Sequence, residues 1–255
     1  MNFDSATALS LGQRESQQDA VTADFNLGDP FGFVVLSDGM GGHAAGDMAS
    51  KIVVTEMFSE LKLKTGDCEA FERDIAKVLR DAVRSANDCI SAHVIENPAH
   101  RGMGATVLAS VIFEDRMYWA SVGDSPLFLF RAGKLERLNE DHSMAPQIDA
   151  MAKTGQLSAE VARNHPDRGS LMSVLIGSSI PKLDCRSAPY KLTDGDIILA
   201  ASDGVNSLED RKLATEIGRV RKRTAAEIAE YLLEAVRKAG LPKQDNTSLG
   251  IIKIE

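Results

Sequence analysis

Five aspartates stand next to glycine, serine, alanine or asparagine, in contexts that suit metal chemistry. They are Asp19 in Gln-Gln-Asp-Ala, Asp38 in Ser-Asp-Gly-Met-Gly-Gly, Asp124 in Val-Gly-Asp-Ser, Asp203 in Ala-Ser-Asp-Gly and Asp245 in Gln-Asp-Asn. An aspartate after an apolar strand places a hard oxygen ligand at a sheet edge, and a following glycine frees the backbone to turn there. No Cys or His cluster accompanies the aspartates, so the set favours Mg²⁺ or Mn²⁺ over zinc. One Asp-Gly pair is more often a plain turn, and the argument therefore rests on the whole set.

These aspartates are far apart in the chain, so secondary structure must bring them together. Short apolar runs, several of them separated by turn residues, predict the strands of a meander. The predicted strands are 31–37, 107–113, 117–122, 127–131, 134–138, 197–201 and 248–254. Apolar residues at helical spacing predict helices over 45–57 and 71–90. The capping box Thr224-Ala-Ala-Glu227 predicts another helix, and Gly240 stands where that helix should end.

Two further segments complete the expected architecture. Residues 143–170 are polar and interrupted, which predicts a helical excursion over the sheet. Asp194-Gly195 predicts a hairpin turn that leads into strand 197–201. The order of strands, helices, strands and helices indicates an α+β fold in which helices pack on antiparallel sheets.

Composition excludes several classes of protein. The 255 residues carry 29 Lys and Arg against 37 Asp and Glu, a formal charge of −8, which argues against a nucleic-acid partner. No apolar stretch approaches the length of about 18 residues that a membrane helix needs, and the first residues do not form a secretory signal. The widely spaced Cys68, Cys89 and Cys185 indicate reduced thiols in a cytoplasm. We expect Cys68 and Cys89 to be packing residues on helices.

Taken in order, the aspartate contexts resemble the motifs of the PP2C family of metal-dependent protein serine/threonine phosphatases, in its bacterial form. The similarity runs from Gly12 to about Ile252. Its motifs are Arg14-Glu-Ser-Gln-Gln-Asp19, Ser37-Asp-Gly-Met-Gly-Gly-His43, Gly104-Ala-Thr106, Val122-Gly-Asp-Ser125, Ser202-Asp-Gly-Val205 and Asp245-Asn246. The resemblance implies a single-domain α-β-β-α sandwich over residues 1–255, in which two antiparallel sheets are flanked by helices. It also implies that 143–170 form a flap beside a metal centre at one end of the sandwich.

The same resemblance assigns a role to each motif. Asp38 would bridge two Mn²⁺ or Mg²⁺ ions, and the Gly39 carbonyl would bind one of them. Asp203 and Asp245 would hold the second ion, and Asp19 would orient bound water. Asp124 would bind a third, weaker ion together with Asp203. Arg14 would hold the substrate phosphate.

The chain also departs from the family pattern. Gln17 stands where the family has Asn, and Pro126 stands where many members have arginine. Met40 occupies the place of a histidine that protonates the leaving group in eukaryotic members, and it has no proton to donate. His43 is the candidate substitute acid. The alternatives are that His43 only caps the start of a helix, or that a metal-bound water donates the proton. We expect His142 and His165 to be structural loop residues.

The resemblance implies hydrolysis of phosphoserine and phosphothreonine in proteins by a metal-activated water, opposing a serine/threonine kinase. A phosphate dianion that approaches a chain of charge −8 needs local positive charge, which two ions and Arg14 would supply. Two alternatives stay open. One is a non-catalytic phosphoprotein-binding module on the same fold. The other is a phosphatase of a small-molecule phosphoester, because the motifs define the chemistry and not the leaving group.

Overall fold

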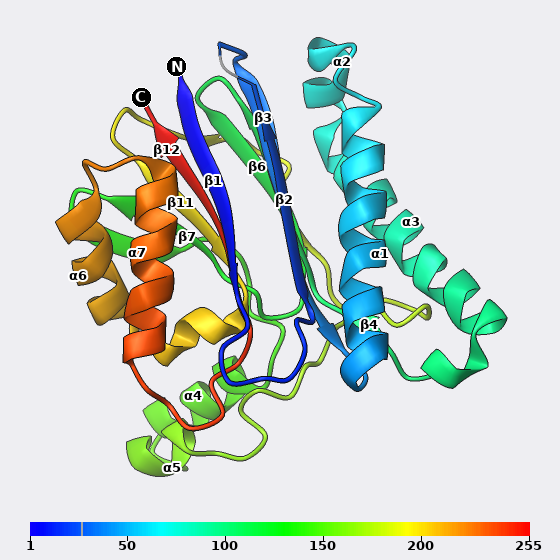
Figure 1. The fold of residues 1–255 in the computed structure, drawn as a ribbon, viewed down its shortest axis with the longest axis vertical. Helices are drawn as coiled ribbons and strands as arrows, with labels where there is room; N and C mark the ends of the chain where they lie inside the picture. The colour runs from blue at the N-terminus through cyan, green and yellow to red at the C-terminus, as the bar shows by residue number, and fades with distance from the viewer. Residues whose placement is uncertain (27) are drawn as a thin grey trace.

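The computed structural model describes residues 1–255 except residue 27 and the side chains of residues 43 and 44. Within the described residues the strands form two antiparallel sheets that pack face to face, with helices on both outer faces (Figure 1). Sheet A has the strand order β1 (Phe3–Ser10), β12 (Thr247–Ile254), β11 (Ile197–Ala201), β7 (Leu127–Arg131) and β8 (Lys134–Arg137). Sheet B has the order β10 (Tyr190–Lys191), β6 (Arg116–Val122), β5 (Val107–Phe113), β3 (Phe31–Met40) and β2 (Asp19–Phe25). Two short strands extend sheet B, β4 (Gly104–Ala105) on β3 and β9 (Asp184–Cys185) on β6.

The helices divide between the two sheets. Sheet B is covered by α1 (His43–Lys62), α2 (Cys68–Arg73) and α3 (Ile75–Glu96). Sheet A is covered by α6 (Asp210–Val220) and α7 (Ala225–Lys238). The helices α4 (Ala145–Lys153) and α5 (Ala159–Arg163) lie at one end of the sandwich, at the bottom of Figure 1. Short 3₁₀ turns cover Pro98–His100 and Asp203–Ser207.

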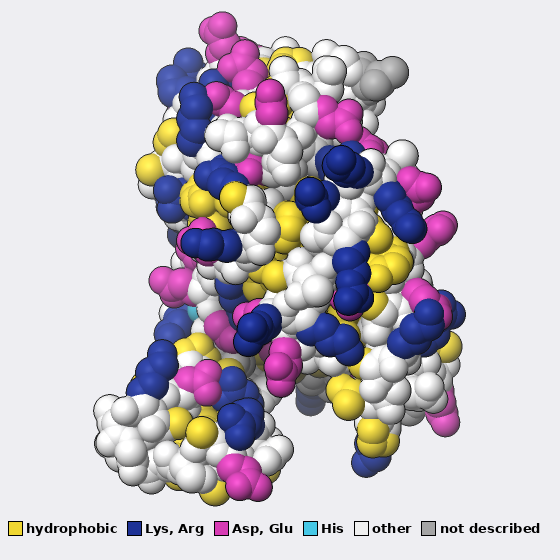
Figure 2. Space-filling model, turned by 90° about the vertical axis from the view of Figure 1, so that its left-hand side faces the viewer, with side chains coloured by type: hydrophobic (Ala, Val, Ile, Leu, Met, Phe, Trp, Pro, Cys, Tyr) yellow, Lys and Arg dark blue, Asp and Glu magenta, His cyan; other side chains and the backbone are white. Residues whose placement is uncertain are grey.

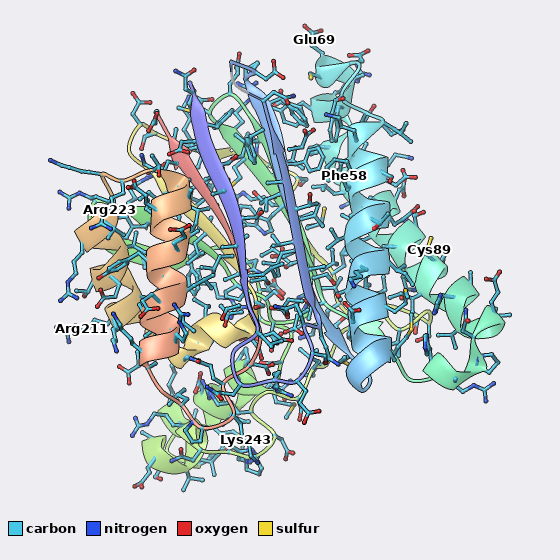
Figure 3. All side chains as sticks on the ribbon, in the orientation of Figure 1. Phe58, Glu69, Cys89, Arg211, Arg223 and Lys243 are labelled. Carbon is cyan, nitrogen blue, oxygen red and sulfur yellow. The ribbon has the colours of Figure 1, made fainter. Side chains whose placement is uncertain are left out.

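The sandwich has three apolar layers because its central strands are buried on both faces. On β3, Phe33 and Val35 face α1, while Val34 between them faces sheet A, as the two-residue period of a strand requires. Phe58 points from α1 toward sheet B (Figure 3), and its ring lies 5.4 Å from that of Phe33. A matching layer between sheet A and α6–α7 buries residues such as Leu199 and Ile228. Layers on both faces of each sheet hold the strand ends rigidly, and those ends carry the aspartates.

The expected sandwich fold is confirmed, and so are most of its elements. The predicted strands over 107–113 and 197–201 match β5 and β11 residue for residue. The predicted excursion over 143–170 contains α4 and α5. The capping box is formed, since Thr224 accepts from the Glu227 N–H and Glu227 accepts from the Thr224 N–H. Gly240 follows α7 with a φ of +63°, as a helix-ending glycine does.

Several expectations are wrong in detail. The predicted helix over 71–90 is broken at Asp74, because α2 turns aside so that Phe71 packs 5.6 Å from Phe31 and 5.2 Å from Phe113. Asp194-Gly195 forms a turn but closes no hairpin: β10 before it pairs with β6 in sheet B, and β11 after it belongs to sheet A.

The cysteine expectation also needs correction. Cys68 lies on a helix but is exposed, and Cys89 is half-buried, so neither is a core packing residue. In the part of the chain that the structure describes, no helix has the length and apolar character needed to cross a membrane.

Candidate active site

Four of the five aspartates line one cavity of about 510 Å³ at the end of the sandwich where α4 and α5 lie. Arg14 lines the cavity with them, together with residues 39–41 and 169–171. The lining residues are Arg14, Gln18, Asp38, Gly39, Met40, Gly41, Thr106, Asp124, Gly169, Ser170, Leu171, Val174, Asp203, Asp245 and Asn246. The structure therefore brings together residues that are more than 230 positions apart, as the motif order predicts.

Asp38 is placed by its position inside β3, which continues to Met40 instead of ending at Ser37. Its backbone N–H donates to Thr106 Oγ1 at 3.0 Å, and the Thr106 N–H donates to the Asp38 carbonyl at 2.8 Å. Thr106 Oγ1 also shares a hydrogen bond of 2.9 Å with Ser125 Oγ. One buried hydroxyl therefore joins the strand of Asp38 to the turn that carries Asp124.

Asp19 lies beside Asp38, since the two residues are register partners of β2 and β3. Its side chain is buried, and its Oδ2 accepts a hydrogen bond of 2.6 Å from Ser202 Oγ. Ser202 Oγ in turn accepts from the Ser248 N–H at 2.9 Å. Ser202 thus connects Asp19 in sheet B to β12 in sheet A, and it directly precedes Asp203.

Arg14 and Asp245 form an ion pair at the mouth of the cavity. Arg14 Nη2 lies 2.5 Å from Asp245 Oδ2, with about half of the arginine side chain exposed. The neighbouring Asn246 fixes this corner, because it accepts from the Gln18 N–H at 2.8 Å and donates to the Leu11 carbonyl at 2.8 Å. The guanidinium is therefore held within reach of an anion that enters the cavity.

The electrostatics of the cavity are those of an acid cluster short of positive charge. Burial raises the pKa of Asp124 from 3.8 to about 7, and repulsion from Asp203 and Asp141 adds to the rise. Burial also raises the pKa values of Asp19 and Asp203 to about 6. The pKa of Asp38 lies well above its ordinary value because of burial and then of Asp19, Asp203, Asp124 and Asp245 around it. At Asp203 the positive charge of Arg14 lowers the pKa, but the pKa still lies above its ordinary value.

The residues of the cavity fit divalent cations. Asp203 Oδ1 is buried and has no hydrogen-bond partner among the described residues, so it is available as a ligand for a cation. The donor set consists of carboxylate and carbonyl oxygens, the ligands that Mg²⁺ and Mn²⁺ take. Among the described residues no group of three or more acidic, His or Cys side chains lies close enough together to hold an ion.

Gly39 has a reason to be glycine. A Cβ there would lie 2.0 Å from the Gly46 carbonyl oxygen and 2.8 Å from that of Gln18, so no side chain fits. The close packing brings the start of α1 onto the end of β3. The Gly39 backbone therefore lines the cavity beside Asp38.

The α4–α5 segment stands out from the body of the molecule, with a hollow between the two (Figure 2). A second cavity of about 550 Å³ lies in this region and shares Asp124, Asp203 and Gly169 with the first. Arg163 and Arg168 of the segment line it. Residues 143–170 are thus next to the acid cluster.

The departures from the family pattern have definite places. Gln17 uses its longer amide locally, accepting from the Asp19 N–H at 3.0 Å and donating to the Ser10 carbonyl at 3.1 Å. Met40 lines the cavity and is 38% exposed, so the cavity wall is apolar at this position. α1 begins at His43, but the side chain of His43 lies outside the described part of the structure. Pro126 accepts from the Ala201 N–H with its carbonyl, a strand contact.

Sequence reasoning missed Asn139. Its buried side chain accepts from the Leu127 N–H at 2.8 Å and donates to Ser121 Oγ and the Ser125 carbonyl. Asn139 therefore holds the turn that carries Asp124 from both sides, at Ser121 and Ser125. No motif marks Asn139, because the contact depends on β8 folding back on β7, which returns the residue after β8 to the turn between β6 and β7. Ser202 and Asn246 also stabilise the site, and both lie inside quoted motifs.

Comparison with known proteins identifies the family of the chain. The model of the Protein phosphatase 2C family matches residues 10–244, and the chain belongs to that family. Serine/threonine phosphatase stp of Listeria monocytogenes is 30% identical over 220 residues, which are 86% of this chain and 83% of that protein. Serine/threonine protein phosphatase PstP of Mycobacterium tuberculosis is 30% identical over 242 residues, which are 94% of this chain but 43% of PstP.

Solved structures show the same fold. The crystal structure of the Mycobacterium tuberculosis phosphatase PstP/Ppp has a TM-score of 0.81 at 28% identity and covers 100% of both chains. The catalytic domain of PstP in complex with two manganese ions has a TM-score of 0.78 at 27% identity and covers 100% of this chain and 99% of that one.

Proposed function

We propose that this chain is a metal-dependent protein phosphatase that hydrolyses phosphoserine and phosphothreonine with two Mn²⁺ or Mg²⁺ ions. The observation that carries the proposal is the cluster of Asp38, Asp124, Asp203 and Asp245 in one cavity with Arg14 at its mouth. A cluster of carboxylates with raised pKa values is costly unless cations compensate it. The relatives named serine/threonine phosphatases, and the PstP domain with two manganese ions, support the same reading.

Each residue has a proposed part in holding the ions. Asp38, the Gly39 carbonyl, Asp203 and Asp245 would hold two ions. Asp124 and Asp203 would hold a third, weaker ion, and Asp19, the neighbour of Asp38 across the strand pair, would orient bound water. When bound, the ions supply Lewis acidity that lowers the pKa of a water and neutralises phosphoryl charge. The orphaned Asp203 Oδ1 supports this assignment most directly.

The protein's own groups bind and orient the substrate. The Arg14 guanidinium can hold two phosphoryl oxygens in a fork, which aligns the phosphorus for in-line attack. To do so it must leave Asp245, to which it is paired at 2.5 Å. A cation held by Asp245 would replace the positive charge that Arg14 provides, and Arg14 would then be free to bind the phosphate.

The leaving-group oxygen needs a proton from a source other than Met40, which has none to give. We propose His43 as that acid because it starts α1 just after the turn that follows Asp38. An unchanged alkaline limb of the rate profile in His43→Asn would reject this role in favour of solvent water. Phosphoesters with a low leaving-group pKa should be less sensitive to the substitution than alkyl phosphoesters, because their leaving groups need less protonation.

The first test is hydrolysis of p-nitrophenyl phosphate with Mn²⁺ and Mg²⁺ titrated into metal-free protein. We expect activity that saturates with metal and is abolished by a chelator. No activity at any metal concentration in folded protein would reject the enzyme and favour the phosphoprotein-binding module. The presence of every acidic motif residue argues against that module.

A second comparison separates protein substrates from small ones. Values of kcat/KM for phosphoserine and phosphothreonine peptides should exceed those for sugar and nucleoside monophosphates. The reverse order would favour a small-molecule phosphatase. The exposed cavity beside residues 143–170 has room for peptide on either side of the phosphoresidue. We propose that this segment acts as a flap of a catalytic domain formed by residues 1–255.

The partners follow from this activity. We propose phosphoproteins of the cytoplasm as substrates and a serine/threonine kinase as the opposing enzyme. Phosphorylation of kinase substrates should rise in cells that lack this protein and return with the wild-type chain. An unchanged kinase-dependent phosphoproteome would contradict the pairing. The acidic charge of −8 gives no support for a nucleic-acid partner.

A further inference from the structure

His142 is a buried histidine that the proposed chemistry does not use. It lies between β8 and α4, and its side chain is 1% exposed. The backbone N–H of Gly123 donates to His142 Nδ1 at 3.2 Å, and the backbone N–H of His142 donates to the Gly123 carbonyl at 3.1 Å. One residue therefore satisfies both backbone polar groups of Gly123, the residue directly before Asp124.

The geometry defines the state of the imidazole. Since Nδ1 faces an N–H group it must accept, so the proton of the neutral ring is on Nε2. Nε2 is buried without a hydrogen-bond partner among the described residues, and the carboxylate of Glu140 lies 3.7 Å away. Burial also lowers the pKa of His142, which favours the neutral ring. If the ring were protonated, its Nδ1–H would face the Gly123 N–H, and two donors would meet without an acceptor.

Gly123 is a turn that needs such support. Its φ is +108°, and a Cβ there would lie 2.6 Å from Thr106 Cγ2. The turn therefore packs against Thr106, the same residue that receives the Asp38 N–H. A loss of the histidine contact would loosen the backbone that places Asp124 opposite Asp203.

His142 also stands at the base of the 143–170 segment. Its carbonyl accepts from the Met172 N–H at 2.7 Å, and the next residue, Ser143, forms a bridge with Leu171. The Met144 N–H donates to the Ser170 carbonyl at 3.0 Å. Both ends of the segment are thus joined at His142, and its last residues, Gly169 and Ser170, line the cavity together with the following Leu171.

We propose that His142 is a positioning residue for the phosphatase reaction: its neutral ring holds the Gly123–Asp124 turn, and its backbone ties that turn to the base of the 143–170 segment. The role rests on the proposed function, since it acts through Asp124 and the adjacent cavity. A loop residue that merely filled space would have no need of an acceptor at Nδ1. The inference therefore predicts that acceptor chemistry, more than volume, decides the effect of a substitution.

The experiment compares His142→Asn, His142→Leu and His165→Leu with the wild type. Asparagine places an oxygen near the position of Nδ1, whereas leucine fills space and accepts nothing. His165 is the matched control, because its Nδ1 also accepts a backbone N–H, that of Asp167 at 3.2 Å, but within the same loop. We expect His142→Leu to lower kcat about tenfold or more and to raise the Mn²⁺ concentration needed for half-maximal rate. His142→Asn should keep kcat within about threefold of the wild-type value, and His165→Leu should have the wild-type kcat.

Amide hydrogen exchange gives a readout that does not depend on turnover. The Gly123 and Met172 amides should exchange faster in His142→Leu than in the wild type, and His142→Asn should restore protection at Gly123. Equal exchange and equal kcat in His142→Leu would overturn the proposal, and so would an Asn variant as impaired as the Leu variant. If the wild type shows no metal-dependent hydrolysis, the proposed function fails, while the exchange data still test the link from His142 to Gly123.

Discussion

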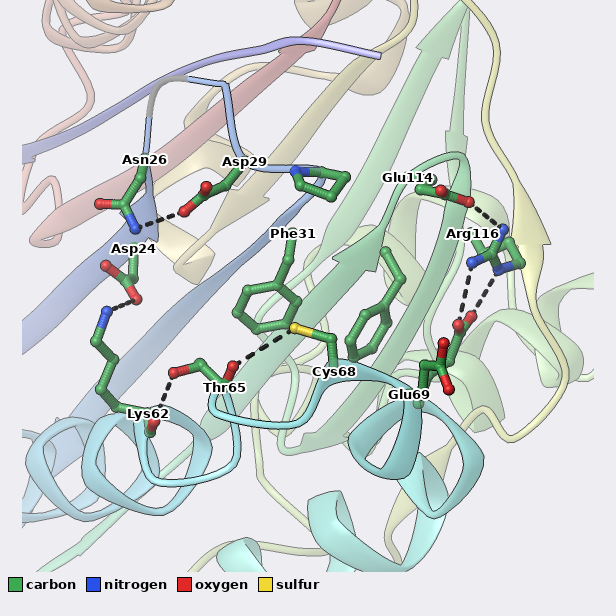
Figure 4. Close-up of a pocket in the computed structure, with 13 residues that line it drawn as sticks. Asp24, Asn26, Asp29, Phe31, Lys62, Thr65, Cys68, Glu69, Glu114 and Arg116 are labelled. Carbon is green, nitrogen blue, oxygen red and sulfur yellow. Dashed lines mark hydrogen bonds and ion pairs between the residues drawn. The ribbon is translucent and has the colours of Figure 1, made fainter.

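The two ends of the sandwich each carry a cavity lined by several carboxylates, yet their electrostatics differ. The cavity at the far end, of about 460 Å³, is lined by Asp24, Asp29, Glu69, Glu72 and Glu114 around Phe31 and Phe113 (Figure 4). The cavity at the proposed active end, of about 510 Å³, has Asp38, Asp124, Asp203 and Asp245. Number of acids and volume do not distinguish the two cavities.

What distinguishes them is compensation by cations. At the far end Lys62 lies 2.6 Å from Asp24, and Arg116 binds Glu72 through two hydrogen bonds of 2.6 and 3.0 Å. Arg116 thereby holds the pKa of Glu72 below its ordinary value. At the proposed active end burial and mutual repulsion raise the pKa values instead, and among the described residues Arg14 forms an ion pair with Asp245. Acids that are paired contribute to stability, and acids left short of cations indicate where an ion binds.

The largest difference between the two ends should appear in catalysis. Asp38→Asn removes the carboxylate at the centre of the acid cluster while keeping shape, and we expect at least about a 10³-fold loss of kcat. Glu72→Gln at the far end should leave kcat within about twofold, because Glu72 lies on α2 beside the other cavity. Steady-state kinetics with saturating Mn²⁺ measure both. A wild-type rate in Asp38→Asn would remove the basis for the proposed active site.

The second difference should appear in the stability of metal-free protein. The pKa of Asp124 rises from 3.8 to about 7 on folding, so its contribution to stability is intact below about pH 4 and is lost as pH rises to 7. Asp124→Asn should therefore stabilise metal-free protein at pH 8, by about 2–4 kcal/mol at about 1.4 kcal/mol per pKa unit. That corresponds to roughly 4–16 °C in Tm for a chain of this size.

Thermal unfolding with a chelator at pH 8 and pH 4.5 tests the sign. The variant should unfold at a higher temperature than the wild type at pH 8, and the difference should become much smaller at pH 4.5. Added Mn²⁺ should reverse the order at pH 8, because the wild type gains binding energy that Asp124→Asn partly lacks. A variant less stable than the wild type at pH 8 without metal would show that Asp124 is compensated by other groups.

A third effect concerns the link between two acidic turns. Thr106→Val removes the hydroxyl that accepts from the Asp38 N–H and bonds Ser125, at nearly constant volume. We expect about a tenfold loss of kcat, since the Asp38 backbone loses its acceptor in a buried place. Thr106→Ser keeps the hydroxyl and serves as the control, with an expected loss of less than threefold. Equal rates in the two variants would assign the role to packing on Gly123.

Local sequence signals were sufficient for much of the fold. The capping box at Thr224 and the apolar run 197–201 fix an element and its ends from neighbouring residues alone. Asp194-Gly195 marks a turn equally well, but which strands flank it in space depends on pairing with β6 and β7, far away in the chain. Asp74 interrupts the predicted helix because Phe71 has aromatic partners on sheet B, and no local pattern contains them.

The site was predictable to the same depth. The aspartates carry local signals, a neighbouring glycine, serine or asparagine, and the cavity brings four of them together with Arg14. Their surroundings carry none: the Arg14–Asp245 pair, the Asn139 contacts and the His142–Gly123 contact all join separate segments. The motifs thus predict which residues meet, and only the fold shows which groups stabilise them and how their pKa values shift.

The smallest effect belongs to the far end and has the opposite dependence on pH. Because Arg116 lowers the pKa of Glu72, the stabilisation is present above the ordinary value of 4.5 and is lost as pH falls through the lowered pKa. Glu72→Gln should cost about 1 kcal/mol at pH 7, or roughly 2–4 °C in Tm, since the pair is partly exposed and Tyr118, which donates to Glu72 Oε1 at 2.8 Å, would face a neutral amide in place of a carboxylate. Glu69→Gln, on the same helix and exposed, should change Tm by less than about 1 °C. Chelator should leave the effect of Glu72→Gln unchanged. If the effect of Glu72→Gln depended on metal, the far end of the sandwich would respond to ions at the proposed active end. The two cavities would then not be electrostatically independent.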